Sequence, residues 1–198
     1  MDNLENLGIA ELSHLYIAAK TSPTEVVTHT LERIEKLEPK LGAFEVVLAD
    51  RAMEAAVGAE RAIKNGHRIG PFHGVPFVLK DLIHVEGTVT TGGTNLYTER
   101  VSTATAPIAH RLIAGGGILV GKTKTVEVAL GPWGTNTQRG TPWNPWDTKS
   151  HRAPGGSSSG TGASVAARLA TCGVGTDTGI PGSKLTARKS SPSAAVAT

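Results

Sequence analysis

Two segments of the sequence carry residues whose types and spacing suit proton transfer. The first is the apolar run from Gly74 to Leu79, which ends in Lys80. Burial disfavours the charged form of a lysine, and a lysine brought towards neutrality can act as a general base. Taken alone, Lys80 is more simply read as a strand-end lysine whose amine reaches solvent.

The second segment is the loop PGGSSSGTG at residues 154–162, which leads into an expected helix. Glycines let the backbone bend tightly and approach a ligand, and the first turn of a helix offers free N–H donors. The adjacent hydroxyls of Ser157, Ser158 and Ser159 suit a proton relay or an anion site. The alternative is a flexible Gly-Ser linker, which the position of the loop next to an ordered Trp-Asn-Pro-Trp region disfavours.

The elements that must position these segments follow from hydrophobic periodicity and turn residues. Ser22-Pro23-Thr24-Glu25 is a capping box with proline at the first helical position, so it predicts a helix start, and Pro39 is expected to follow the helix end. Other helices are predicted at about 9–16, 50–64, 105–114 and 159–169, and buried strands at 74–79, 118–120 and 172–176. Continuous apolar strands that alternate with helices predict an α/β sheet covered on both faces.

The sequence also contains a literal match to the phosphate-loop motif of nucleotide-binding proteins. Residues 116–123, GGILVGKT, fit the phosphate-loop pattern of two glycines, a lysine and a threonine. That loop must follow a strand and precede a helix, with a flexible backbone around the anion. Here Ile-Leu-Val in the middle of the pattern is itself strand-like, and the preceding segment looks helical. We therefore interpret the match as a buried strand bounded by glycines; the nucleotide alternative would require ATP binding that depends on Lys122.

Composition excludes several classes of protein. The chain has 198 residues, 39% hydrophobic and 19% charged, with a net charge of +3, which is typical of a globular domain. Without a run of like charges we expect no nucleic-acid partner. Because Cys172 is the only cysteine, an internal disulfide is excluded and a reducing compartment is favoured. We interpret Cys172 as a small buried hydrophobic residue rather than a nucleophile. No signal peptide and no run of ~18 apolar residues is present, so the cytoplasm is expected and a membrane partner is not.

Taken together, the motifs resemble the amidase signature family over residues 7 to 179. The similarity runs through GPFHGVPFVLKDLIHVEG, GGTNLY, AGGGILVGKTKTVEVALG, GTPWNPWD, APGGSSSGTGASVAA and GVGTDTG. So long a collinear match is specific, whereas a Gly-Ser loop alone would be weak. The resemblance implies the N-terminal part of a mixed β-sheet flanked by helices, incomplete here. It also implies hydrolysis of carboxamides through an acyl-serine intermediate, with a small-molecule amide as substrate, no metal or cofactor, and a homodimer as an open possibility.

The resemblance also assigns roles to residues. Lys80 matches the family's catalytic lysine, and Ser157 matches the bridging serine, which in the family sits on a cis peptide bond. Neutral Lys80 would take a proton from Ser157 while Ser157 takes one from the nucleophilic serine. Backbone N–H groups of the turn after residue 177 would stabilise the oxyanion. The positions that support this turn are Ser158, Asp177, Thr178 and Gly179.

The resemblance breaks where the nucleophile should be. In the family GTDTG continues as Gly-Ser-(Ile/Val)-Arg, whereas this chain has Ile180 and Pro181. Proline has neither a hydroxyl nor an N–H, so Pro181 can neither attack nor donate to an oxyanion. Ser183 is a weak substitute, because the family's arginine and the apolar segment after it are also missing.

These observations predict a family domain over residues 1–179 and a disordered tail outside the family over 180–198, out of frame or appended. The chain is then a truncated amidase that is inactive alone. Two alternatives stay open: a shortened active amidase that uses Ser183, and a non-catalytic interaction module on the same scaffold. The motifs do not separate a general amidase from the amidotransferase subunit that acts on misacylated tRNA.

Overall fold

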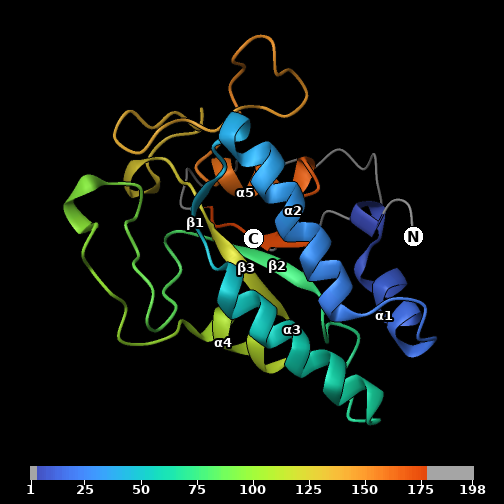
Figure 1. The fold of residues 1–198 in the computed structure, drawn as a ribbon. Coiled ribbons are helices and arrows are strands. Elements are labelled where there is room, and N and C mark those ends of the chain that lie inside the picture. Colours follow the sequence, from blue (N-terminus) through green and yellow to red (C-terminus); the bar gives the residue numbers. More distant parts are fainter. Residues whose placement is uncertain (1–3, 178–198) are drawn as a thin grey trace.

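A four-stranded mixed sheet lies at the centre of the computed structural model, which describes residues 4–177 (Figure 1). The strands are β1 (Phe44–Val47), β2 (Pro76–Lys80), β3 (Ile118–Thr123) and β4 (Cys172–Val174), in the spatial order β1-β3-β2-β4. β2 is parallel to β3 and β4, and β1 is antiparallel to β3. The mixed α/β sheet expected from the sequence is therefore confirmed. β1 was not predicted, because its four residues lie between two helices and show no clear alternation.

In the part of the chain that the structure describes, five α-helices surround the sheet: α1 (Ile9–Ile17), α2 (Pro23–Leu41), α3 (Ala49–Lys64), α4 (Pro107–Ala114) and α5 (Ser159–Ala166). The same residues also form three single-turn 3-10 helices, at Leu4–Asn6, Asn95–Tyr97 and Glu127–Ala129. α5 is three residues shorter than predicted, and β3 extends three residues beyond its predicted end. None of the helices within residues 4–177 combines the length and the apolar character that crossing a bilayer requires.

The start of α2 follows its predicted cap, but its predicted end is wrong. Ser22 Oγ accepts a hydrogen bond from the Glu25 backbone N–H at 3.2 Å. The helix runs through Pro39 to Leu41, and Gly42 closes it in the left-handed conformation at φ 57°. Proline removes only one helical hydrogen bond there. The carboxylate of Glu38 accepts from the backbone N–H groups of the first two residues after Gly42, which holds the chain as it enters β1.

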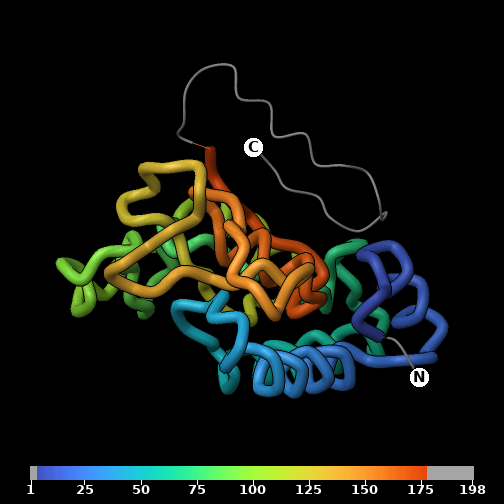
Figure 2. Tube along the Cα trace, turned by 90° about the horizontal axis from the view of Figure 1, so that it is seen from above, coloured from blue at the N-terminus to red at the C-terminus, as the bar shows by residue number. Residues whose placement is uncertain are grey.

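The sheet is covered on both faces, as the sequence predicted. On one face, α2, α3 and α5 pack with the strands into a single core that includes Val27, Ile34, Val78, Val120 and Ala163. On the other face, α4 and the segment after β2 pack against Phe77, Leu79 and Leu119. Figure 2 shows α2 and α3 lying side by side as one layer along one edge of the molecule.

The pairing of β2 with β3 contains an irregularity that places two lysines. Phe77 pairs with Leu119, but Val78 pairs with Gly121, so β3 has one extra residue at this point. Beyond the irregularity, Lys80 pairs with Thr123, and Lys122 stands beside the residue before Lys80. Without the extra residue Lys80 and Lys122 would be paired on one face. Because side chains alternate along a strand, the shift sends the two lysines to opposite faces of the sheet.

Candidate active site

Lys80 is the last residue of β2, and its side chain has no exposed surface. Its Nζ lies 2.7 Å from Ser157 Oγ, 2.9 Å from Thr176 Oγ1 and 3.3 Å from the Thr176 carbonyl oxygen. The simple reading of a strand-end lysine whose amine reaches solvent is therefore wrong. The amine is instead enclosed between the Gly-Ser loop and the segment that follows β4.

The surroundings of this amine weaken its charge. Burial lowers the pKa of Lys80 from its ordinary value to about 8, and the negative charge of Asp177 opposes that change. A neutral amine has two N–H bonds and one lone pair. With both N–H bonds donated to the oxygens of Thr176, the lone pair is left for the hydroxyl of Ser157, so this arrangement can take a proton from Ser157.

Ser157 is held by its backbone. The Gly156–Ser157 peptide bond is cis, as the resemblance implied. The Ser157 carbonyl oxygen accepts two hydrogen bonds at 3.0 Å, from the Val126 backbone N–H and from Thr125 Oγ1. A Cβ on Gly156 would lie 2.7 Å from the backbone nitrogen of Gly134, so the loop packs directly on another backbone segment. These contacts fix the hydroxyl that faces Lys80.

Ser158 connects the Gly-Ser loop to the segment after β4. Its hydroxyl donates to the Thr176 carbonyl oxygen and accepts from the Thr176 backbone N–H, both at 3.1 Å. Thr176 therefore contacts Lys80 and Ser158 together, although sequence reasoning assigned it no role. The signal was present in GVGTDTG, where Thr176 stands directly before the selected Asp177.

Of the remaining predicted site residues, Asp177 is the last residue that the structure describes, and the others follow it in the chain. Asp177 is exposed, and its charge acts on Lys80. Thr178, Gly179, Pro181 and Ser183 lie outside the described residues, so the predicted oxyanion turn and both nucleophile positions stay predictions. The same holds for the predicted disorder of residues 180–198.

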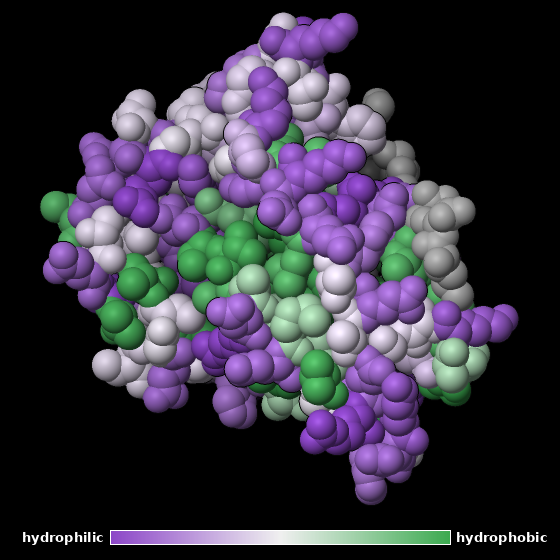
Figure 3. All heavy atoms as spheres, viewed as in Figure 1, coloured by the Kyte–Doolittle hydropathy of each residue, from purple (hydrophilic) through white to green (hydrophobic). Residues whose placement is uncertain are grey.

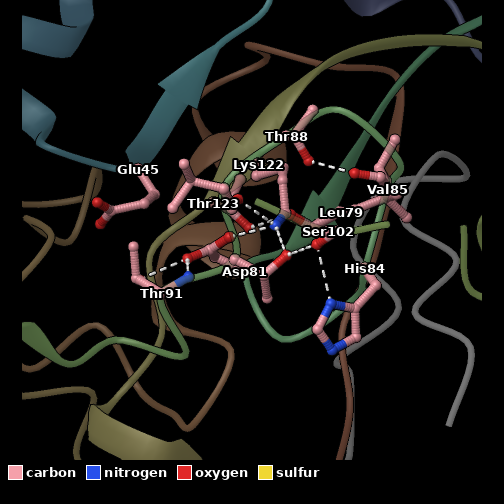
Figure 4. Close-up of polar contacts among 12 residues, drawn as sticks. Glu45, Leu79, Asp81, His84, Val85, Thr88, Thr91, Ser102, Lys122 and Thr123 are labelled. Atoms are coloured by element: carbon pink, nitrogen blue, oxygen red, sulfur yellow. Dashed lines mark hydrogen bonds and ion pairs between the residues drawn. The ribbon is translucent and has the colours of Figure 1, made fainter. Parts of the chain in front are cut away.

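The lysine of the phosphate-loop pattern lies in a second polar cluster, on the other face of the sheet (Figure 4). Lys122 Nζ is 2.5 Å from Asp81 Oδ1, 2.8 Å from the Val89 carbonyl oxygen and 2.6 Å from Thr90 Oγ1. Residues 121–123 belong to β3 itself, which confirms the interpretation of the pattern as a strand. Lys122 has no exposed surface and a carboxylate already in contact, so it is not placed to bind a phosphate.

Two other chemical candidates have ordinary explanations. Cys172 is half-buried and packs against the α4 side of the sheet, and burial raises the pKa of its thiol to about 11. Little thiolate exists at neutral pH under those conditions. Within residues 4–177, His, Cys, Asp and Glu side chains form no group of three that could hold a metal ion.

An apolar groove lies on the face that carries α2 and α3 (Figure 3). It is lined by Leu31, Ile34, Pro39, Val47 and Met53, with glutamates of α2 along its border. None of the predicted site residues lines this groove. The hydroxyl and amine groups described above therefore mark the candidate active site, and the groove does not.

The fold and these motifs together agree with a known family. The family model described as Amidase matches residues 25–183. The chain belongs to the amidase signature family. The A subunit of glutamyl-tRNA(Gln) amidotransferase from Symbiobacterium thermophilum is 40% identical over 174 residues, which are 87% of this chain and 35% of that protein. The protein of the same name from Aromatoleum aromaticum is 41% identical over 174 residues, 88% of this chain and 35% of its own length.

Solved structures of other proteins agree with this assignment. The native peptide amidase of Stenotrophomonas maltophilia matches with a TM-score of 0.76 and 30% identity, over 83% of this chain and 34% of that one. A 6-aminohexanoate cyclic dimer hydrolase matches with a TM-score of 0.75 and 28% identity, over 86% of this chain and 33% of that one. The chain thus spans about 35% of the length of the curated relatives it matches, and its fold is an incomplete amidase-signature fold.

Proposed function

We propose that this chain carries the lysine–serine proton relay of an amidase that cleaves carboxamide C–N bonds through an acyl-serine intermediate. The observation that supports it best is the 2.7 Å contact between Lys80 Nζ and Ser157 Oγ, made by a lysine without exposed surface. The pKa of Lys80, lowered to about 8, is close enough to neutral pH for a general base.

In this proposal each group moves one proton. Neutral Lys80 accepts the hydroxyl proton of Ser157, and Ser157 accepts the proton of the nucleophilic serine as its oxygen bonds to the amide carbon. The carbonyl oxygen becomes an oxyanion, which N–H groups of the turn at Thr178 and Gly179 would stabilise. The relay then returns a proton to the departing amine, and water releases the acid from the acyl-serine by the same steps in reverse.

Because Pro181 occupies the position of the nucleophile, the chain by itself is proposed to hydrolyse no amide. The shortened active amidase is the rival, and the extent of the family match to residue 183 includes its Ser183. The two proposals differ at a single hydroxyl, so one labelling experiment separates them.

The experiment treats the full chain with a fluorophosphonate and reads the mass of the product. The relay proposal without a nucleophile expects no adduct and no release of ammonia from a primary carboxamide. An adduct that Ser183→Ala and Lys80→Ala both abolish would replace it with the active Ser183 enzyme. An adduct that survives both substitutions would contradict both proposals. A folded chain that forms no adduct yet binds a protein partner would favour the interaction module.

A second candidate concerns the subfamily. The curated relatives named above are both A subunits of an amidotransferase, at 40% and 41% identity, whereas the two solved amidases are 28% and 30% identical. We therefore propose an origin closer to the amidotransferase type, whose name refers to glutamyl-tRNA(Gln). Titration of the chain with L-glutamine and with a C-terminal peptide amide, followed by NMR, tests this. Shifts at Ser157 and Ser158 with the peptide amide alone would favour a general amidase.

A further inference from the structure

The buried pair of Asp81 and Lys122 lies directly next to the proposed base. Asp81 follows Lys80 in the chain, and neither Asp81 nor Lys122 has exposed surface. Lys122 Nζ donates hydrogen bonds to Val89 O and Thr90 Oγ1 and forms an ion pair with Asp81 Oδ1. The second carboxylate oxygen, Oδ2, accepts from the Thr91 backbone N–H at 2.9 Å and from Thr91 Oγ1 at 2.6 Å. Asp81 Oδ2 is thus satisfied by hydrogen bonds, whereas the buried Oδ1 depends on the ion pair with Lys122.

The backbone of Asp81 is fixed as firmly as its side chain. Its N–H donates to the Thr123 carbonyl oxygen at 2.9 Å, and its carbonyl oxygen accepts from the Gly92 N–H at 3.0 Å. Thr123 Oγ1 donates to the Leu79 carbonyl oxygen at 3.2 Å and shares a 2.7 Å hydrogen bond with Thr161 Oγ1 of α5. The residues before and after Lys80 are therefore tied to β3, and through Thr161 to the helix that follows Ser157.

Other charged groups lie at the border of this cluster. His84 Nδ1 is 2.9 Å from Ser102 Oγ, which is 2.9 Å from Thr90 Oγ1. Arg100 can only donate, so its 3.1 Å contact makes His84 Nε2 an acceptor and leaves the ring proton on Nδ1. Hence His84 does not deprotonate Ser102, and the Ser102–His84 pair is no second nucleophilic site.

The charges that act on the cluster come from several elements. Asp81, Glu45 and Arg100 act on Lys122, and Asp177 acts on Lys80. Arg139 lies beyond Glu45 and forms an ion pair with it. Of these groups, only Asp81 is both adjacent to Lys80 in the chain and buried with a matched opposite charge.

We propose that Asp81 and Lys122 are positioning residues for Lys80. Their ion pair anchors the chain directly after the base. The charge of each residue also cancels the effect that the charge of the other would have on Lys80 across the sheet. This inference rests on the proposed function of Lys80 as the base. It assigns Lys122, the lysine of the phosphate-loop pattern, a role in the amidase site.

The inference predicts opposite effects for the two halves of the pair. Asp81→Asn leaves the positive charge of Lys122 uncompensated, so the pKa of Lys80 falls by about one unit. Lys122→Met leaves the carboxylate uncompensated, so the pKa of Lys80 rises by about one unit. The double variant removes both charges and restores the wild-type value. A purely structural role would loosen the site in both single variants and move the pKa in one direction.

The measurement is a pH titration of the full chain labelled with 13C at the lysine ε-carbon, followed by NMR, with the Lys80 signal assigned through Lys80→Arg. Shifts of opposite sign in Asp81→Asn and Lys122→Met, with recovery in the double variant, support the inference. Shifts of one sign, or none, overturn it. The ion pair between the partly buried Glu60 and the exposed Lys64 supplies the matched controls, because Glu60→Gln and Lys64→Met should leave Lys80 unchanged.

If either single variant does not fold, two substitutions at Thr91 test the inference instead. Thr91→Val removes the hydroxyl that compensates the Asp81 carboxylate, so the pKa of Lys80 should rise, while Thr91→Ser should keep the wild-type value. Equal values in these two variants overturn the inference. Failure of the proposed function looks different: the wild-type Lys80 would then titrate near the ordinary value of 10.5, whatever the variants do.

Discussion

Lys80 and Lys122 stand near the ends of neighbouring parallel strands, both without exposed surface, and different charged groups act on them. Lys122 contacts a carboxylate, a carbonyl oxygen and a hydroxyl, whereas Lys80 contacts two hydroxyls and a carbonyl oxygen. Burial lowers the pKa of both lysines. Asp81, in contact with Lys122, opposes that change there, and the charge of Asp177 opposes it at Lys80. The difference shows how one sheet holds a structural ion pair on one face and a potential base on the other.

The largest expected effect comes from breaking the ion pair. Lys122→Met leaves Asp81 buried without its counter-charge and should lower the free energy of unfolding by about 3–5 kcal/mol. Adding Asp81→Asn should recover most of that loss, because no uncompensated charge remains. Urea denaturation of the single and double variants measures both. Lys64→Met, which removes the exposed lysine of another ion pair, is the control and should stay within about 0.5 kcal/mol of wild type. An equal loss in the single and double variants would contradict the comparison.

The lowered pKa of Lys80 should be visible in the pH dependence of the free energy of unfolding. Its pKa is about 8 in the folded state and 10.5 ordinarily, so between these values the unfolded chain binds more protons. Stability should therefore rise with pH across this window, by about 2–3 kcal/mol between pH 7 and pH 10. Lys80→Met should lack that rise. Urea denaturation of both proteins at the two pH values gives the difference, and identical pH profiles would refute the assignment.

The irregularity that separates the lysines depends on Gly121. A Cβ at this position would lie 2.6 Å from the Val46 carbonyl oxygen and 2.8 Å from the ring of Phe44. Gly121→Ala should therefore push β1 from β3 and cost about 2 kcal/mol. Gly58→Ala is the matched control, since nothing lies within 4 Å of its Cβ and alanine favours the helix. Thermal unfolding compares the two, and a stable Gly121→Ala would show that the register tolerates a side chain.

The smallest effect concerns the neutral partners of Lys80. Thr176 Oγ1 accepts a hydrogen bond from the amine, which favours its charged form. Thr176→Val should therefore lower the pKa of Lys80 by about half a unit, whereas Thr176→Ser should leave it unchanged. The same 13C titration resolves the shift. A higher pKa in Thr176→Val would mean that the hydroxyl acts as a donor to the amine instead.

Much of the fold was predictable because its signals are local. The capping box at Ser22 and the apolar runs of β2, β3 and β4 each lie within a few residues of the element they specify. β1 was missed because its four residues pair antiparallel with a strand more than seventy positions away. The end of α2 was misplaced because Glu38 holds the next segment, which is a tertiary effect on a local stop signal.

The candidate site was predictable in part. The resemblance selected Lys80, Ser157 and Ser158, and the structure brings all three together with Thr176. Thr176 was not predicted because its only signal is its place directly before Asp177 in GVGTDTG, and a threonine there has no distinctive pattern of its own. Asp81 and Lys122 were both visible in the sequence, yet their pairing joins two strands and two loops that only the folded chain brings into contact.

By itself the sequence determined which residues are available: two lysines at the ends of apolar runs, a Gly-Ser loop before a helix, and proline where a serine nucleophile is expected. The tertiary structure decided what each lysine faces. Side chains alternate with a period of two along a strand, so a single extra residue in β3 changes the face on which Lys122 lies. That register depends on contacts between separate strands and on the close approach of β1 at Gly121, which no local pattern encodes.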